Sequence, residues 1–235
     1  MKTTAITHVG LTERQNQDQF LIKEFSGDSV LVAVADGAGG TPAGEKASGV
    51  VIERLSDFQP DSPTPEEHLV RLMQEADQKI FGVVEKEADL KGMGSTLTAA
   101  FVRGETVFWA HVGDSRLYLF RADELTQITE DDTMAGFLLT EGEITREEAR
   151  VHPGRSFLFD FIGSGGFEEE TGSFALCKND LLLLTTDGLH DRVPEETLVT
   201  ILRSNSELDK KLDALISAAL EATGKDDLTV VGMEI

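Results

Sequence analysis

The segment Val30–Gly40, with the sequence VLVAVADGAGG, decides the interpretation of this chain. Its first six residues are all apolar, which is typical of a strand buried on both faces. Asp36 follows at the end of that run, and the next four residues are too small to cover its side chain. Because a buried bare carboxylate costs free energy, we expect Asp36 to have a partner. Gly37 lets a ligand or metal ion approach the backbone closely.

The composition indicates an acidic globular protein, whose length allows one large domain or two small ones. No linker long enough to separate two domains occurs, so we expect a single domain over residues 1–235. The chain has 43 acidic and 21 basic residues, a net charge of −22 and 40% hydrophobic residues. This charge disfavours nucleic acid and anionic membranes as partners and attracts divalent cations. The single Cys177 excludes an internal disulfide framework and is typical of a reducing compartment. No apolar run approaches the roughly 18 residues of a membrane span, and the first residues do not resemble a secretory signal, so we expect a cytoplasmic protein.

The order of the predicted elements favours an antiparallel α+β fold over a parallel doubly wound one, because strands outnumber crossover helices. Residues 64–67, Thr-Pro-Glu-Glu, predict a helix start with a capping box, and the apolar spacing carries that helix to about Lys86. Residues 131–166 are polar and weakly periodic, with one short helix expected near Thr145–Ala149. The predicted strands are Thr4–Gly10, Gln19–Phe25, Val30–Ala35, Ser95–Val102, Thr106–Val112, Arg116–Phe120, Leu125–Ile128, Asp180–Thr186 and Leu228–Ile235, and the other predicted helices are Ala43–Leu55, Pro194–Arg203 and Ser206–Ala222.

Several other carboxylates stand at the ends of predicted strands, as Asp36 does. They are Asp18, Asp114, Asp187 with Asp191 one turn later, and Asp226. Each of them alone can be a turn residue that closes a strand. Adjacent strands end near one another, however, and converging carboxylates repel unless cations lie between them. A ligand set made only of oxygen atoms favours Mg²⁺ or Mn²⁺ over Zn²⁺, and two such ions can clamp a phosphoryl group.

Six short motifs occur in one order between residues 10 and 232. They are Asn16-Gln17-Asp18, Asp36-Gly37-Ala38-Gly39-Gly40, Gly94-Ser95-Thr96, Gly113-Asp114-Ser115-Arg116, Asp187-Gly188-Leu189-His190-Asp191 and Asp226-Asp227-Leu228-Thr229-Val230-Val231. With this ordered set the chain resembles the metal-dependent serine/threonine protein phosphatases of type 2C, of the bacterial type. The resemblance implies a four-layer α-β-β-α sandwich, in which two antiparallel sheets are flanked by helices and residues 131–166 form a flap.

The resemblance also implies a catalytic centre with two Mn²⁺ or Mg²⁺ ions. Asp36 would bridge both ions, the Gly37 carbonyl would bind one of them, and Asp187 and Asp226 would bind the other, with Asp18 acting directly or through water. Asp114, with Asp191 or Asp187, would hold a weaker third ion. A hydroxide that bridges the two metal ions would then hydrolyse phosphoserine or phosphothreonine by direct attack. The implied partner is a phosphorylated protein, a serine/threonine kinase or its target.

The chain departs from the family pattern at the residue that binds phosphate. The arginine of the family falls on Glu13 here, and the nearest arginine is Arg14. On an extended strand a shift of one residue turns a side chain to the opposite face. Either a local bulge turns the Arg14 side chain back toward the phosphate, or phosphate is held differently and weakly.

Three further departures and three residues without an expected catalytic role complete this interpretation. Ala38 stands where some eukaryotic members carry a histidine, and Asp227 replaces the usual asparagine after Asp226. Asp131-Asp132-Thr133 replaces the usual Asp-His-Ser at the entry to the flap. We expect structural roles for Arg116, which would form an ion pair, for His190 and for His152.

Two alternatives to an active phosphatase follow from Glu13 and Arg14. One is a catalytically weak or inactive pseudophosphatase that binds a phosphoprotein partner. The other is a regulatory phosphatase of the partner-switching type.

Overall fold

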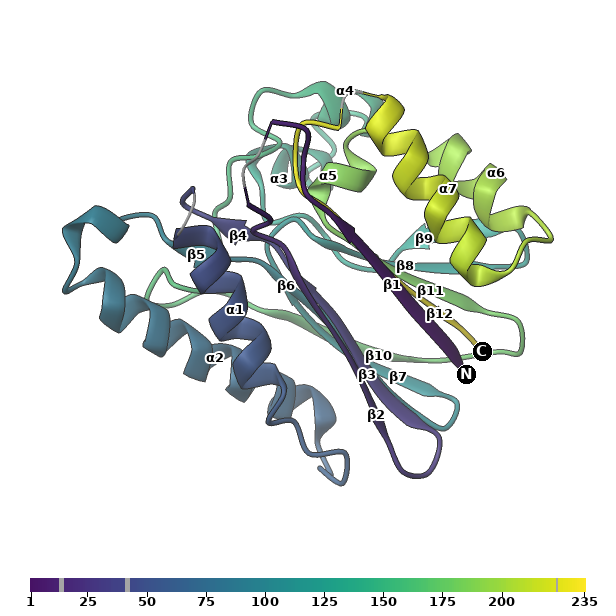
Figure 1. The fold of residues 1–235 in the computed structure, drawn as a ribbon, viewed down its shortest axis with the longest axis horizontal. Helices are drawn as coiled ribbons and strands as arrows, with labels where there is room; N and C mark the ends of the chain where they lie inside the picture. The colour runs from purple at the N-terminus through teal and green to yellow at the C-terminus, as the bar shows by residue number, and fades with distance from the viewer. Residues whose placement is uncertain (13–14, 41–42, 223) are drawn as a thin grey trace.

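Two antiparallel sheets packed face to face form the centre of the molecule. In the computed structural model, which describes residues 1–12, 15–40, 43–222 and 224–235, each of these sheets has five strands (Figure 1). The first sheet has the order β1 (Lys2–His8), β12 (Leu228–Glu234), β11 (Leu181–Thr185), β8 (Arg116–Arg121) and β9 (Glu124–Gln127). The second has the order β10 (Glu170–Ala175), β7 (Thr106–Val112), β6 (Leu97–Arg103), β3 (Ser29–Ala35) and β2 (Gln19–Phe25). A short ladder joins β4 (Gly37–Ala38) to β5 (Gly94–Ser95).

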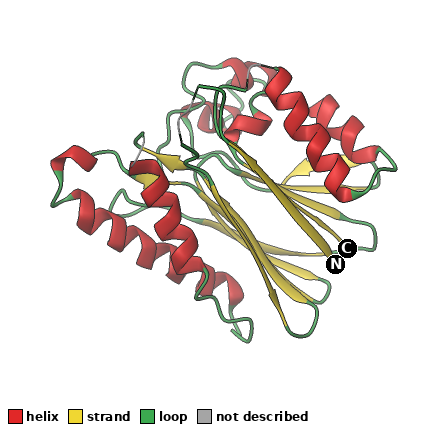
Figure 2. Ribbon diagram, in the orientation of Figure 1, coloured by secondary structure: helices red, strands yellow, loops and turns green. Residues whose placement is uncertain are grey.

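Helices cover the outer faces of both sheets, which gives the four layers that the resemblance implies (Figure 2). Helices α1 (Ala43–Leu55) and α2 (Pro65–Val84) pack on the second sheet. Helices α6 (Glu195–Arg203) and α7 (Leu208–Glu221) cover the first sheet. The remaining helical segments are η1 (Ala88–Leu90), α3 (Met134–Thr140), α4 (Arg146–Val151) and α5 (Asp187–His190). The predicted fold class is therefore confirmed.

Strand β3 is buried along its whole length, as its uninterrupted apolar sequence predicts. Leu31 and Ala33 belong to the core beneath α1 and α2. Val32 and Val34 point the other way, into the core between the two sheets, where Leu182 of the first sheet also packs. Both faces of β3 therefore exclude water, and the carboxylate that follows it is held at the edge of two cores.

The structure corrects the sequence prediction at several elements. Thr64 does precede α2 with Pro65 in the first turn, but its side chain makes no capping hydrogen bond, so the predicted capping box is wrong there. The capping box instead lies at Thr145, whose hydroxyl accepts from the backbone N–H of Glu148. Helix α3 and strand β10 were not predicted. Strand β10 is an edge strand with alternating partial exposure, so it lacks the apolar run that marks the central strands.

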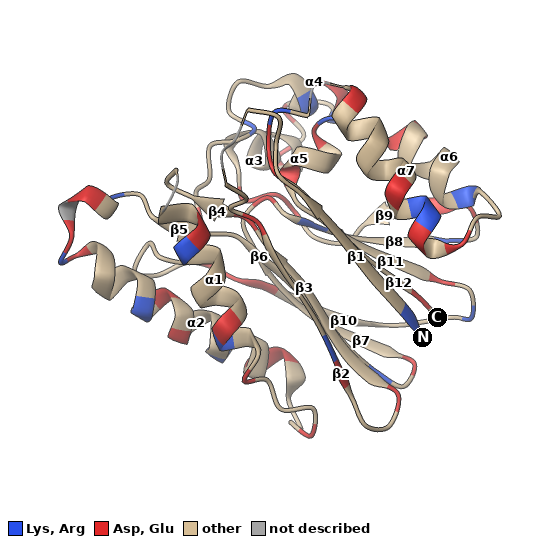
Figure 3. Cartoon of the chain, in the orientation of Figure 1, with Lys and Arg blue, Asp and Glu red and all other residues tan. Residues whose placement is uncertain are grey.

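The chain ends lie side by side because β1 pairs with β12, with Lys2 opposite Glu234 (Figure 1). Acidic residues lie on both helical layers and along the loops between strands (Figure 3). Among the helices that the structure describes, none is both long enough and apolar enough to cross a membrane.

Candidate metal centre

The strand-end aspartates predicted from the sequence lie at one end of the two sheets. Gln19 pairs with Ala35, so Asp18 and Asp36 lie at the same end of the β2–β3 ladder. The backbone N–H of Asp36 donates to the Thr96 hydroxyl at 3.0 Å, and this links β3 to the start of β6. In the first sheet, Thr185 pairs with Val230, so Asp187 and Asp226 flank neighbouring strand ends. Asp114 follows β7 after Gly113, whose φ of 106° is in the region that favours glycine.

Burial and mutual repulsion raise the pKa of four of these carboxyl groups. Burial, with the neighbouring carboxylates of Asp187 and Asp227, raises the pKa of Asp18 to about 8. Burial and the charge of Asp226 raise the pKa of Asp187 to about 7. The pKa values of Asp36 and Asp114 lie well above the ordinary value, first through burial and then through repulsion by the other aspartates. A cation among these groups would offset both the cost of burying the charged carboxylates and the repulsion between them.

The donor atoms fit hard divalent cations. The Oδ1 atom of Asp18 is buried and has no hydrogen-bond partner, while its Oδ2 atom accepts from the Thr186 hydroxyl at 2.8 Å. Buried oxygen atoms without a donor are the ligands that Mg²⁺ and Mn²⁺ prefer. Over the described residues, no three acidic, imidazole or thiol groups already surround one point as a finished ligand set. The carboxylates nevertheless lie close enough to raise one another's pKa.

Gly37 lies where a side chain cannot fit. A Cβ atom at this position would overlap with the carbonyl of Gly44 in the first turn of α1, and would also lie 2.8 Å from the carbonyl oxygen of Gln17. The backbone of β4 therefore lies directly against α1 beside Asp36. The predicted role of the Gly37 carbonyl as a ligand stays a prediction.

Asp226 and Asp227 are placed differently. Asp226 is exposed. Asp227 is buried, and its two carboxylate oxygens accept from the backbone N–H groups of Gly10 at 2.9 Å and Gln17 at 2.7 Å. Asp227 therefore anchors both ends of the segment that joins the two sheets. Arg14 and Glu13 belong to this segment but lie outside the described residues.

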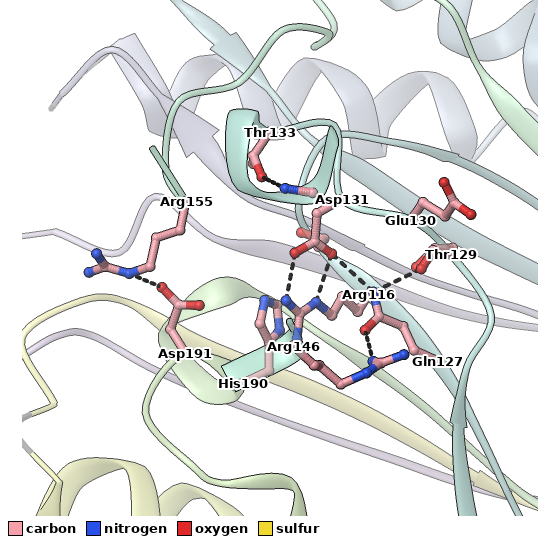
Figure 4. Close-up of polar contacts among 12 residues, drawn as sticks. Arg116, Gln127, Thr129, Glu130, Asp131, Thr133, Arg146, Arg155, His190 and Asp191 are labelled. Carbon is pink, nitrogen blue, oxygen red and sulfur yellow. Dashed lines mark hydrogen bonds and ion pairs between the residues drawn. The ribbon is translucent and has the colours of Figure 1, made fainter. Parts of the chain in front are cut away.

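Two Arg–Asp pairs join the flap, residues 131–166, to the rest of the domain (Figure 4). Arg116 donates to both oxygens of Asp131, at 2.7 Å from Nε and 2.5 Å from Nη2. The ion pair that the sequence predicted for Arg116 is thus present. Arg155 donates to Oδ2 of Asp191 at 2.9 Å. Burial raises the pKa of Asp191, and the charge of Arg116 opposes that shift.

The histidines have structural contacts. Nδ1 of the buried His190 lies 2.8 Å from the Thr185 hydroxyl, and burial lowers the pKa of this imidazole well below its ordinary value. Nδ1 of His152 accepts from the backbone N–H of Gly154 at 3.0 Å. Neither contact is that of a catalytic group.

Sequence reasoning missed two residues beside the carboxylates. Thr186 contacts Asp18, as described, and also accepts from the backbone N–H of Thr229 at 3.0 Å. The sequence does single out Thr186, because Thr185 and Thr186 are polar residues that follow a run of four leucines and directly precede Asp187. Asp132 accepts from the backbone N–H of Gly113 at 2.7 Å, and burial raises its pKa to about 7.

Comparison with known proteins identifies the family. The sequence profile of the protein phosphatase 2C family matches residues 11–229, and the chain belongs to this family. A serine/threonine phosphatase, stp, of Listeria innocua is 37% identical over an alignment of 235 positions, which covers 97% of this chain and 93% of that protein.

Solved structures agree with this assignment. The S. agalactiae serine/threonine phosphatase matches with a TM-score of 0.92 and 29% identity, over all of this chain and 99% of that one. The catalytic domain of the phosphatase PstP, solved in complex with two manganese ions, matches with a TM-score of 0.85 and 36% identity, over 98% and 96% of the two chains. The predicted family and enzyme class are confirmed.

Proposed function

We propose that this protein is a phosphatase of phosphoserine and phosphothreonine in proteins and that it depends on divalent cations. The observation that carries the proposal is the group of strand-end aspartates, in which Asp18 and Asp114 are buried and Asp36 and Asp187 are partly buried. The Oδ1 atom of Asp18 in this group has no hydrogen-bond partner. In the described part of the chain, Asp18, Asp36, Asp114 and Asp187 form no ion pair with lysine or arginine. Several repelling carboxylates at one place are suited to binding cations.

The proposed ligands are those implied by the family pattern. Asp36, the Gly37 carbonyl, Asp18, Asp187 and Asp226 would hold two Mn²⁺ or Mg²⁺ ions, and Asp114 with Asp191 would hold a third. When bound, the ions supply positive charge to the phosphoryl oxygens and activate the attacking water. Water adds to phosphorus as the bond to the serine or threonine oxygen breaks, which yields the free hydroxyl side chain and inorganic phosphate.

The other residues would position these groups. Thr186 fixes the orientation of the Asp18 carboxylate through the hydrogen bond from its hydroxyl. Arg14 would bind the phosphate from the segment whose ends Asp227 holds. Ala38 cannot donate a proton, so the leaving oxygen would receive its proton from water.

We further propose a single catalytic domain over residues 1–235 that acts in the cytoplasm in phosphorylation signalling, on a serine/threonine kinase or its target. The near-complete coverage of the Listeria innocua relative supports the single domain. The acidic composition and the single Cys177 are typical of a cytoplasmic enzyme.

The test is hydrolysis of p-nitrophenyl phosphate with added Mn²⁺, comparing the wild type with Asp36→Asn. We expect activity that EDTA abolishes and that Asp36→Asn lowers at least a thousand-fold, on the order of the effect of losing a group that acts in the transition state. Removal of one repelling charge should also raise the melting temperature of the metal-free protein. Asp61→Asn, at an exposed aspartate, serves as the matched control and should change neither quantity. A wild type that is inactive with every divalent ion yet binds phosphoproteins would establish the pseudophosphatase instead.

A further inference from the structure

Five large apolar side chains of the flap are exposed to solvent, and four of them lie on α3 and on the segment that follows α4. Met134, Phe137, Phe157 and Phe159 have exposed fractions of 36%, 55%, 62% and 45%. We call these four side chains the flap patch. Large apolar side chains are normally buried, and a group of them on the surface marks a binding surface.

The flap patch is continuous. Met134 and Phe137 are three residues apart in α3, so they share one side of the helix. The backbone N–H of Met134 donates to the carbonyl of Phe157 at 3.2 Å, and the rings of Phe157 and Phe159 pack edge to face at 5.8 Å. The other side of α3 behaves differently, because Ala135, Gly136 and Leu139 line a cavity of about 840 Å³. Helix α3 therefore lines this cavity with one side and exposes Met134 and Phe137 of the flap patch on the other.

The backbone connects the flap patch to the carboxylate site. The N–H of Phe159 donates to the carbonyl of Asp132 at 2.8 Å, and the Asp132 side chain accepts from Gly113, next to Asp114. Further along the same segment, the N–H of Ile162 donates to the carbonyl of Ser95 at 2.9 Å, and Ser95 pairs with Gly37. A polypeptide with a residue among the strand-end aspartates therefore has the flap patch within reach of its neighbouring residues.

The surroundings of the flap patch are acidic. The carboxylates of Asp160 and Glu170 are close enough to Asp132 to repel its charge. Among the ion pairs of the described residues, none involves these three carboxylates. The flap also carries the exposed Glu141, Glu143, Glu147 and Glu148, which outnumber its exposed Arg146 and Arg150. These two arginines line the cavity on the other side of α3. Charge complementarity therefore favours a basic occupant.

We propose that the flap patch binds the residues beside the phosphorylated residue of the substrate and selects a bulky apolar residue accompanied by lysine or arginine. This inference rests on the proposed phosphatase function. The apolar side chain would leave water against Phe157 and Phe159, and the cation would meet Asp132, Asp160 and Glu170. With a net charge of −22 on the enzyme, an acidic substrate segment would be repelled.

The experiment compares two phosphothreonine peptides of equal length. One carries leucine and lysine on both sides of the phosphothreonine, and the other carries serine and glutamate at the same positions. The enzymes are the wild type, the double variant Phe157→Ser/Phe159→Ser and the control Val151→Ser. Val151 is 77% exposed at the end of α4, so its substitution tests for a general effect on the flap.

We expect the wild type to show a KM about ten-fold lower for the leucine–lysine peptide, with similar kcat. The double variant should lose this difference, and Val151→Ser should keep it. All three proteins should hydrolyse p-nitrophenyl phosphate equally, because that substrate has no flanking residues. Dissociation constants from fluorescence anisotropy of the labelled peptides supply the same comparison without turnover.

Equal KM and dissociation constants for the two peptides in the wild type would overturn the inference. So would a dimer, seen by sedimentation equilibrium, that the double variant loses while the peptide constants stay unchanged, because the flap patch would then bind a second copy. Failure of the phosphatase proposal is a separate result, since it appears as absent hydrolysis of p-nitrophenyl phosphate by the wild type.

Discussion

The hydroxyl of Thr186 donates to the carboxylate of Asp18 at 2.8 Å, across the ends of the two sheets. The same oxygen accepts from the backbone N–H of Thr229 at 3.0 Å. Asp18 precedes β2 of the second sheet, while Thr186 directly follows β11 of the first sheet and Thr229 lies in the neighbouring β12. One buried hydroxyl therefore fixes a proposed metal ligand relative to the other sheet.

Thr186→Val should weaken cation binding with little change in shape. The variant removes the hydroxyl that donates to Oδ2 of Asp18, so the carboxylate is held less well in its orientation. We expect the affinity for Mn²⁺ to fall about ten-fold, the scale for losing a group that orients a metal ligand. Isothermal titration calorimetry measures this affinity. Thr200→Val is the control, because the Thr200 hydroxyl donates only to the Glu196 carbonyl on the surface of α6. Equal affinities in the two variants would contradict the role of Thr186.

The metal-free protein should lose stability as the pH rises from about 4 to about 8. The pKa of Asp18 is about 8 in the folded chain against an ordinary value of 3.8, and that of Asp187 is about 7. Between these values the folded state binds more protons than the unfolded state, so the free energy of unfolding falls with increasing pH. Thermal unfolding in EDTA across this range measures the effect.

Two comparisons test the origin of that pH dependence. Asp18→Asn should flatten the decrease in melting temperature, because it removes one of the titrating groups. Mn²⁺ should raise the melting temperature more at pH 8 than at pH 5, where protons compete for the carboxylates. A metal-free protein whose stability rises with pH throughout this range would show that these groups are not buried together as described.

Gly37→Ala should destabilise the protein and disturb the metal centre. The added methyl group would overlap with the Gly44 carbonyl, so β4 or α1 must move. We expect a loss of about 2 kcal/mol in the free energy of unfolding, within the range for overpacking a close contact, together with weaker Mn²⁺ binding. Gly49→Ala is the matched control in the adjacent helix α1, where no atom lies within 4 Å of the new Cβ. That control should gain about 0.5–1 kcal/mol in urea denaturation. Equal effects of both substitutions would contradict the contact.

Arg121→Ala should cost more stability than Arg116→Ala. Both arginines donate to two oxygens of one aspartate, Asp180 and Asp131 respectively. The side chain of Asp180 is 2% exposed and that of Asp131 is 15% exposed, so removal of Arg121 leaves the more deeply buried charge without its partner. We expect a loss of about 3 kcal/mol for Arg121→Ala in urea denaturation and a smaller loss for Arg116→Ala. A larger loss for Arg116→Ala would contradict this order.

The sequence predicted the central strands because burial on both faces leaves an uninterrupted apolar run, as in Val30–Ala35. It did not predict β10, since partial exposure on an edge mixes polar and apolar residues. It also missed α3, which follows Thr133. The hydroxyl of Thr133 caps this helix by accepting from Gly136 N–H, but the helix shows no amphipathic pattern because Met134 and Phe137 face solvent.

The sequence likewise predicted only part of the candidate site. Strand ends carrying Asp18, Asp36 and Asp187 could be predicted to converge, because register places neighbouring ends together. The roles of Thr186 and Asp132 could not, since they depend on hydrogen bonds between segments far apart in the chain. The burial of Asp227 beside the exposed Asp226 likewise depends on its two backbone donors, which adjacent sequence does not show.

The hydrogen bonds of Asp227 to Gly10 and Gln17 have a consequence for protein engineering. They hold residues 10 and 17 from outside the segment, at the start of β12. Asn16 must be kept, because its side chain bonds the Thr7 hydroxyl and the backbone N–H of Asp18. A library over residues 11–15 would move the arginine along the segment while Asn16 and the aspartates stay constant.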